Sequence, residues 1–92
     1  MEFEWDDGKN ETNIGKHGIG FATAKRIFEG PVATSRDHRR DYGEDRHISI
    51  GSVEPGALIV VVHTERHGRI RLISARPASR KERKAYHERT LR

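Results

Sequence analysis

The segment from Ile70 to Tyr86, IRLISARPASRKERKAY, constrains the fold most, because it requires a strand and a helix in direct succession. Ile70 and Leu72 alternate with arginines, which is the pattern of a strand with one face on a core. Ser79 and Glu82 then have the spacing of a capping box, in which each side chain accepts a hydrogen bond from the other residue's backbone amide. The sequence therefore predicts a helix that begins near Ser79.

The charge of this helix is unusual for its position. Four cations fall in its first turns, where positive charge opposes the helix dipole: Arg80, Lys81, Arg83 and Lys84. Apart from Ala85 and Tyr86 the helix has almost no apolar face, so packing explains it poorly. A phosphate would neutralise the cations, and we therefore expect an anionic ligand here.

Charge is distributed unevenly along the whole chain. Residues 1–30 contain four Lys or Arg against six Asp or Glu, whereas residues 66–92 contain ten against two. Such a basic cluster is expected of a protein that binds nucleic acid or an acidic partner. The alternative is a solvated basic tail that only aids solubility.

Length and composition limit the class of protein further. The 92 residues allow one domain, residues 1–92, with a modest core. The chain has no cysteine, so it forms neither a disulfide nor a thiolate zinc site. It has no apolar stretch of membrane-spanning length, and its acidic start is unlike a secretory signal. We therefore expect a soluble protein of the cytoplasm with no membrane partner.

The rest of the chain predicts an α+β fold. The run 58–62 (LIVVV) is apolar on both faces and rich in β-branched residues, which indicates a central strand. Strands at 46–53 and from 70 onward flank it through turns at 54–56 and 65–68, which gives an antiparallel meander. Before it we expect short strands at 3–5 and 32–34, helices at 8–17 and 20–29, and a mobile polar loop at 35–45.

The sequence contains no motif for a metal or a cofactor. His63 and His67 straddle a turn, and no glycine-rich phosphate loop follows a strand. What remains suits metal-free cleavage of RNA, in which the substrate's own 2′-hydroxyl attacks the phosphate while the protein supplies a base, an acid and cations. Arginine binds phosphate oxygens in pairs. Arg76 lies just before the capped helix, Arg46 begins a neighbouring strand, and Arg66 lies at a turn. The candidates for proton transfer are Glu44, Glu65, His17, Glu82 and Tyr86.

Several of these residues also have a structural interpretation. Glu82 completes the capping box, and Tyr86 would attach the last helix to the sheet. Glu44 and Arg46 would simply pair with each other, and His17 would be a cation that complements a helix end.

Several short motifs occur in an order that is specific, although each one alone is weak. They are Phe3-Glu4-Trp5-Asp6, Asn13, Lys16-His17-Gly18, Phe21-x-x-Ala24, Gly43-Glu44-Asp45-Arg46, Val62-His63-Thr64-Glu65-Arg66 and Ile70-Arg71-x-Ile73-Ser74-Ala75-Arg76, followed by Arg80, Glu82, Arg83 and Tyr86. Over residues 2 to 88, their order and spacing resemble the BrnT family of type II toxin–antitoxin toxins. That family is similar in fold to the RelE-like ribonuclease toxins, which pack helices on an antiparallel sheet.

The resemblance implies a metal-independent endoribonuclease that blocks translation by cutting RNA, and the candidate partners are RNA alone or RNA on the ribosome. It implies a cognate antitoxin, BrnA-like and DNA-binding, through which the complex represses its own operator. The catalytic residues it implies are His17, Glu44, Arg46, Arg76 and Tyr86, and the RNA-binding residues are Lys16, Glu65, Arg66, Arg80 and Arg83. The alternatives are a non-catalytic module that binds RNA or an acidic partner, and an inactive toxin that serves only as co-repressor.

Overall fold

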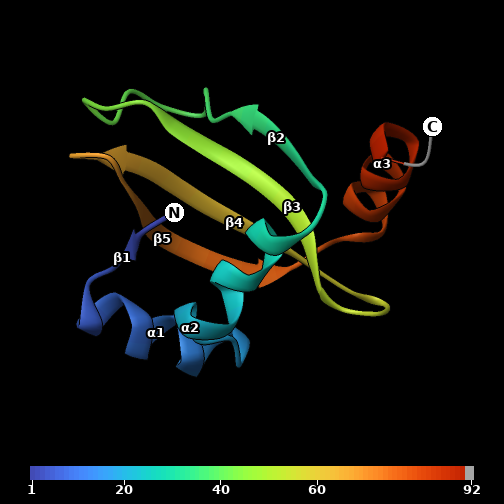
Figure 1. The fold of residues 1–92 in the computed structure, drawn as a ribbon, viewed down its shortest axis with the longest axis horizontal. Coiled ribbons are helices and arrows are strands. Elements are labelled where there is room, and N and C mark those ends of the chain that lie inside the picture. Colours follow the sequence, from blue (N-terminus) through green and yellow to red (C-terminus); the bar gives the residue numbers. More distant parts are fainter. Residues whose placement is uncertain (91–92) are drawn as a thin grey trace.

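A five-stranded sheet with the order β1-β5-β4-β3-β2 forms the centre of the computed structural model, which describes residues 1–90 (Figure 1). The strands are β1 (Phe3–Glu4), β2 (Val32–Arg36), β3 (Arg46–Glu54), β4 (Ala57–Arg66) and β5 (Arg69–Pro77). Strands β3 to β5 form the predicted antiparallel meander, and β2 extends it by pairing antiparallel with β3. The two-residue β1 instead pairs in parallel with β5, opposite Ile70 and Arg71.

The central position of β4 follows from its sequence. Residues 58–62 are buried throughout, because this strand is covered on both faces and paired along both edges. Ile59 and Val61 point to one face, whereas Leu58, Val60 and Val62 point to the other. The apolar run therefore contributes to two separate clusters.

The larger cluster lies between the sheet and the N-terminal helices. Helix α2 (Phe21–Ala24) and the 3-10 helix η1 (Lys25–Glu29) supply its helical side. Helix α1 (Asp7–His17) lies beside α2, and Figure 1 shows both below the sheet. The sequence predicted a single helix over residues 20–29. In the structure this segment is an α-helix only as far as Ala24 and continues as a 3-10 helix. Ile27 packs so closely on Gly51 of β3 that a Cβ at Gly51 would lie 2.7 Å from the Cβ of Ile27.

Helix α1 forms despite its poor intrinsic propensity, because both ends are capped and its centre is tied to the sheet. The Asp6 carboxylate accepts a hydrogen bond from the Lys9 amide, and Gly18 ends the helix with a φ of 70°. Buried Asn13 donates to the carbonyl of Ala75 (2.8 Å) and accepts from its amide (3.0 Å). Its amide group thereby replaces a neighbouring strand at the edge of β5, beyond the end of β1.

Helix α3 (Arg80–Thr90) packs on the opposite face of the sheet. The predicted capping box is present: the Ser79 amide donates to Glu82 Oε1 (2.8 Å) and the Glu82 amide to Ser79 Oγ (3.2 Å). Tyr86 is buried against Ala33 and Leu58 in the smaller cluster, and its hydroxyl donates to the carbonyl of Pro31 (3.0 Å). The contact is the one expected if Tyr86 attaches the helix to the sheet.

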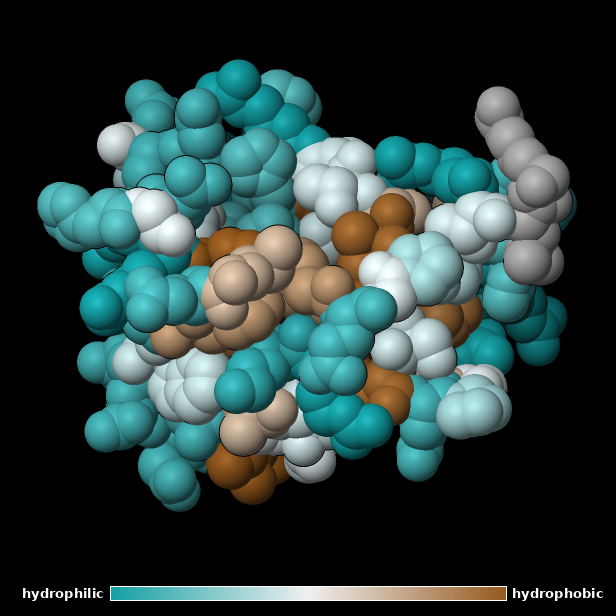
Figure 2. Space-filling view, viewed as in Figure 1, coloured by the Kyte–Doolittle hydropathy of each residue, from teal (hydrophilic) through white to brown (hydrophobic). Residues whose placement is uncertain are grey.

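The face of the molecule seen in Figure 2 is mainly hydrophilic, with apolar side chains gathered near its middle. None of the helices within residues 1–90 is long and apolar enough to cross a membrane. Among the same residues, no group of three or more His, Asp or Glu side chains is placed to hold a metal ion.

Candidate functional site

The register of the sheet places three arginines on one face. Arg46 on β3 and Arg71 on β5 both pair with Thr64 of β4, so all three side chains share a face. Arg76 shares that face, since it pairs with Val60, which lies four residues from Thr64. We call this surface, opposite α1 and α2 and bearing Arg46, Arg71 and Arg76, the arginine face. At about 3.3 Å per residue, Arg46 and Arg76 are offset by roughly 13 Å along the strands.

At one end of the arginine face, Glu44 joins two arginines. Its carboxylate accepts from Arg46 Nε (3.2 Å) and from Arg66 Nη2 (2.8 Å). The hydrogen bond from Arg66 is the main cause that lowers the pKa of Glu44 below its usual value, with Arg46 adding to it. Glu44 therefore stays ionised and is better suited to holding these arginines than to accepting a proton.

At the other end, Arg76 is held by the capping box. Its Nη1 and Nη2 donate to the two carboxylate oxygens of Glu82, each at 2.7 Å. This pairing is the main cause that lowers the pKa of Glu82 to about 2, and hydrogen bonds from Ser79 contribute. The capping box thus does more than begin α3, because it also orients an arginine whose side chain is 42% exposed.

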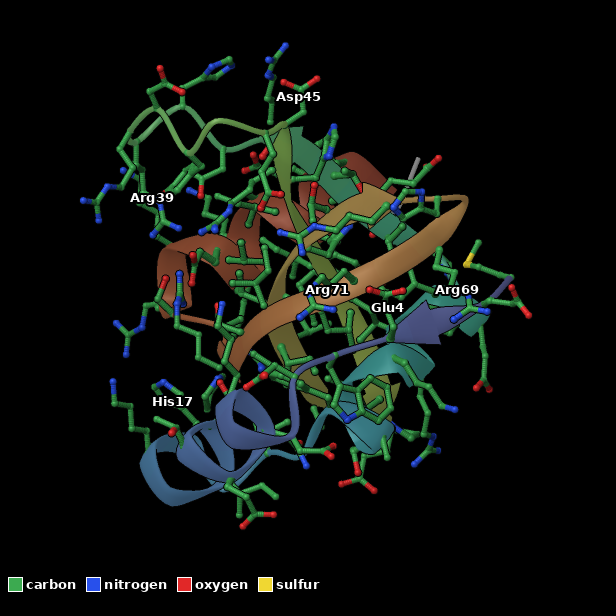
Figure 3. The ribbon with its side chains drawn as sticks, turned by 90° about the vertical axis from the view of Figure 1, so that its left-hand side faces the viewer. Glu4, His17, Arg39, Asp45, Arg69 and Arg71 are labelled. Atoms are coloured by element: carbon green, nitrogen blue, oxygen red, sulfur yellow. The ribbon has the colours of Figure 1, made fainter. Side chains whose placement is uncertain are left out.

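Lys16 and His17 lie at a third place, in the exposed last turn of α1. Together with Asn13 they line a groove against Ile73 and Ser74 of β5. Ser74 pairs with Val62 and so belongs to the arginine face, which means that the groove borders this face at the edge of β5. Figure 3 shows His17 on α1, clearly apart from Arg39 in the loop between β2 and β3, and shows Glu4 and Arg71 turned toward each other between β1 and β5.

The other predicted site residues lie further from these groups. Tyr86 is buried beneath α3, as described above. Glu65 is exposed and pairs with Ile70, which packs on the core beneath α1 and α2, so Glu65 is turned to the helix-covered side. Arg80 is exposed on α3, and Arg83 makes a long hydrogen bond (3.4 Å) to the carbonyl of Gly56. The sheet thus joins Glu44, Arg46 and Arg66, places Arg76 on the same face and does not bring Glu65 there.

The loop between β2 and β3 contributes residues that sequence reasoning missed. Buried Asp37 holds Arg39 and Tyr42 by hydrogen bonds, and the guanidinium carbon of Arg46 lies 4.0 Å from the centroid of the Tyr42 ring. The segment has no strand or helix period, so the pattern indicated only a polar loop. The one available signal was an aromatic residue, Tyr42, within an otherwise charged segment.

Chemically, this arrangement presents fixed positive charge. The arginines on the face are paired with carboxylates, which hold their planar forks in place yet leave further N–H donors unused. Fixed, partly exposed guanidinium groups are suited to binding oxygens of a polyanion such as a nucleic-acid backbone. The fold and face are therefore those expected of a small α+β protein that binds a polyanion.

Comparison with known proteins makes the assignment specific. The family model described as ribonuclease toxin, BrnT, of type II toxin–antitoxin system matches residues 5–82, and the chain belongs to this family. The crystal structure of the Brucella abortus ribonuclease toxin BrnT is similar, with a TM-score of 0.65 and 28% sequence identity over 87% of this chain and 99% of that one. A comparison with curated proteins finds no match. The family and the α+β fold class predicted from the sequence are confirmed.

Proposed function

We propose that this protein is an active, metal-independent endoribonuclease of a toxin–antitoxin module in the cytoplasm. Its action would inhibit translation, and a cognate BrnA-like antitoxin would neutralise it and carry the complex to operator DNA. Membership of a family of ribonuclease toxins supports the general activity and the existence of an antitoxin partner. The observation that carries the reaction proposal is the set of partly exposed, carboxylate-held arginines on one face of the sheet.

In the proposed reaction the 2′-oxygen of a ribose attacks the adjacent phosphorus and the bond to the 5′-oxygen breaks, which leaves a 2′,3′-cyclic phosphate. One group takes the proton of the 2′-hydroxyl, and another returns a proton to the 5′-oxygen. Arg76 would stabilise the negative charge that develops on the oxygens of the phosphate being cleaved. Because Arg46 is offset from Arg76 along the strands, we propose that Arg46 binds another phosphate of the same backbone, with the RNA lying along the arginine face.

For proton transfer we favour His17 over Glu44, Glu82 and Tyr86. Glu44 and Glu82 are held in ion pairs that lower the pKa of each carboxyl group, and the Tyr86 hydroxyl is used in packing. The His17 ring is exposed in the groove that borders Ser74, and imidazole is the side chain that most readily exchanges protons at neutral pH. Lys16 and Arg66 would hold the flanking RNA, and Arg80 and Arg83 would extend the basic surface along α3.

The first test is incubation of the purified protein with end-labelled RNA in EDTA. We expect fragments that end in 2′,3′-cyclic phosphate, and a loss of cleavage of about 100-fold or more for Arg76→Ala, the order of magnitude for removal of one group that stabilises the transition state. Arg26→Ala is the matched control, since Arg26 is exposed on η1, on the other side of the sheet. Equal cleavage by Arg76→Ala and Arg26→Ala would contradict the assigned site.

Uncut RNA with every variant would require the same assay on translating ribosomes. Cleavage only there would identify a ribosome-dependent enzyme. RNA that is bound but uncut in both assays would identify a non-catalytic module, or an inactive toxin that acts as co-repressor.

A further inference from the structure

Asp37, just after β2, is a buried carboxylate with an unusually complete set of partners. Its side chain is 0% exposed, and it accepts hydrogen bonds from the Arg39 amide (3.1 Å), Arg39 Nε (2.8 Å), Arg39 Nη2 (2.8 Å) and the Tyr42 hydroxyl (3.1 Å). Its own amide donates to the carbonyl of Arg46 (2.8 Å). A buried charge is costly unless it is fully paired. This pairing fixes Arg39 and Tyr42 relative to Arg46. We call the three residues Asp37, Arg39 and Tyr42 the Asp37 network.

The Asp37 network lies at the arginine face. The Arg46 guanidinium packs over the Tyr42 ring, with 4.0 Å from its central carbon to the ring centroid. Arg39 and Tyr42 share the Asp37 carboxylate, so the loop brings the Arg39 guanidinium to the end of the arginine face that bears Arg46. Two positive charges, on Arg39 and Arg46, therefore lie in one region. The charge of Arg39 also acts to lower the pKa of Arg76, although Glu82 keeps that pKa raised overall. Like charges repel, and an anion between them would relieve that repulsion.

The geometry of Arg39 leaves it free to bind such an anion. A guanidinium group has five N–H donors, of which the Asp37 carboxylate uses one on Nε and one on Nη2. Three donors remain, and the Arg39 side chain is 63% exposed. Asp37 therefore fixes the plane of the guanidinium without using all of its binding capacity.

We propose that Arg39 is a further phosphate-binding residue of the reaction, and that Asp37 is the positioning residue that orients it beside Arg46. The ligand is a backbone phosphate of single-stranded RNA, so this inference rests on the proposed function. If the Asp37 network served only to fold the loop, the remaining Arg39 donors would meet water alone. A change at Arg39 would then alter stability without a specific effect on RNA.

The test uses Arg39→Lys, because a lysine keeps a positive charge beside buried Asp37 and so preserves folding. Lysine cannot bind Asp37 and a phosphate through one rigid fork, so we expect at least a tenfold loss in single-turnover cleavage with little change in thermal midpoint. Arg26→Lys is the matched control, since Arg26 is exposed on η1, on the other side of the sheet, and forms no ion pair among residues 1–90. Cleavage by Arg39→Lys equal to that by Arg26→Lys would overturn the proposal.

Asp37→Asn, alone and combined with Arg39→Lys, tests the positioning role. If Asp37 acts through Arg39, the double variant should lose no more cleavage than the more impaired single variant, whereas independent effects would multiply. Multiplied losses would overturn the role of Asp37. A second readout is the affinity for an uncleavable 2′-O-methyl RNA, measured with the double variant Arg39→Ala/Asp37→Asn, which leaves no orphaned charge. The negative slope of log affinity against log salt concentration should become less steep by about 0.7, as for one lost phosphate contact on a single strand.

These outcomes separate the inference from the function on which it rests. Wild-type cleavage that is lost in Arg76→Ala but kept in Arg39→Lys would overturn this inference and leave the ribonuclease assignment standing. A wild-type protein that neither binds nor cuts RNA would overturn both.

Discussion

His63 illustrates how a single residue connects pairing in the sheet to stability. It lies on the helix-covered side of β4, with its Nε2 atom 2.7 Å from the Ser49 hydroxyl, which is 2.8 Å from the Thr34 hydroxyl. Burial lowers the pKa of His63 to about 4, and the nearby charge of His47, whose ring stacks on it at 5.8 Å, lowers it further. The folded protein therefore keeps His63 neutral at physiological pH.

This shift predicts a loss of stability in mild acid. Because the pKa of His63 is lower in the folded than in the unfolded chain, the unfolded chain takes up the proton first, and stability falls as pH decreases from about 6.5 to about 4. Between pH 7.5 and 4.5 the contribution is about 2 kcal/mol. Urea unfolding at both pH values measures it: His63→Gln should flatten the dependence, whereas His38→Gln, at an exposed loop position, should not. The same slope in both variants would contradict the assignment to His63.

At the scale of elements, prediction succeeded where the signal is local. The capping box, the Pro55-Gly56 turn and the apolar run of β4 each lie within a few residues, and each is found in the structure. The parallel pairing of β1 and the tightening of η1 were missed, because both depend on distant partners. Ile27 meets Gly51 across the core, and Phe3 meets Ile70 across most of the chain. No local periodicity carries that information.

Helix α3 provides a prediction at the same scale. Glu82 both caps the helix and holds Arg76, so Glu82→Gln should lower the free energy of unfolding at pH 7 by about 1–3 kcal/mol, more than the roughly 1 kcal/mol expected of Ser79→Ala. Glu88→Gln is the control, because Glu88 is exposed on α3 and forms no ion pair among the described residues. Urea unfolding measures all three, and equal losses for Glu82→Gln and Glu88→Gln would show that the pairing with Arg76 adds nothing.

For the molecule as a whole, the candidate site was predictable only in its local parts. Arg76 and Glu82 are six residues apart and Glu44 and Arg46 two, and the sequence singled out all four. The contacts that place them on a common surface are distant: Asn13 reaches Ala75, Arg71 reaches Glu4, and Arg66 reaches Glu44. Asp37 was missed because the partners of its buried carboxylate, Arg39 and Tyr42, come from the same irregular loop, and its sequence neighbours are all polar.

The same distribution of charge predicts how the fold fails in acid. The ion pairs found within residues 1–90 all join arginine to Asp or Glu, and the pKa values of Asp37, Glu44 and Glu82 are lowered mainly by their arginine partners. For a lowered pKa the stabilisation is complete above the unfolded value and is lost as pH falls through the folded one, which for Glu82 means from about 4.5 to about 2. Protonation of the 14 carboxylates leaves 18 Lys and Arg and six His, all positive, to repel one another.

We expect circular dichroism to show unfolding between pH 4 and 2 at low ionic strength. Sodium chloride at 0.5 M should move the midpoint of unfolding to lower pH, because it screens the repulsion. A midpoint that salt leaves unchanged would show that the lost arginine pairs alone, without general repulsion, limit the stability of this basic protein.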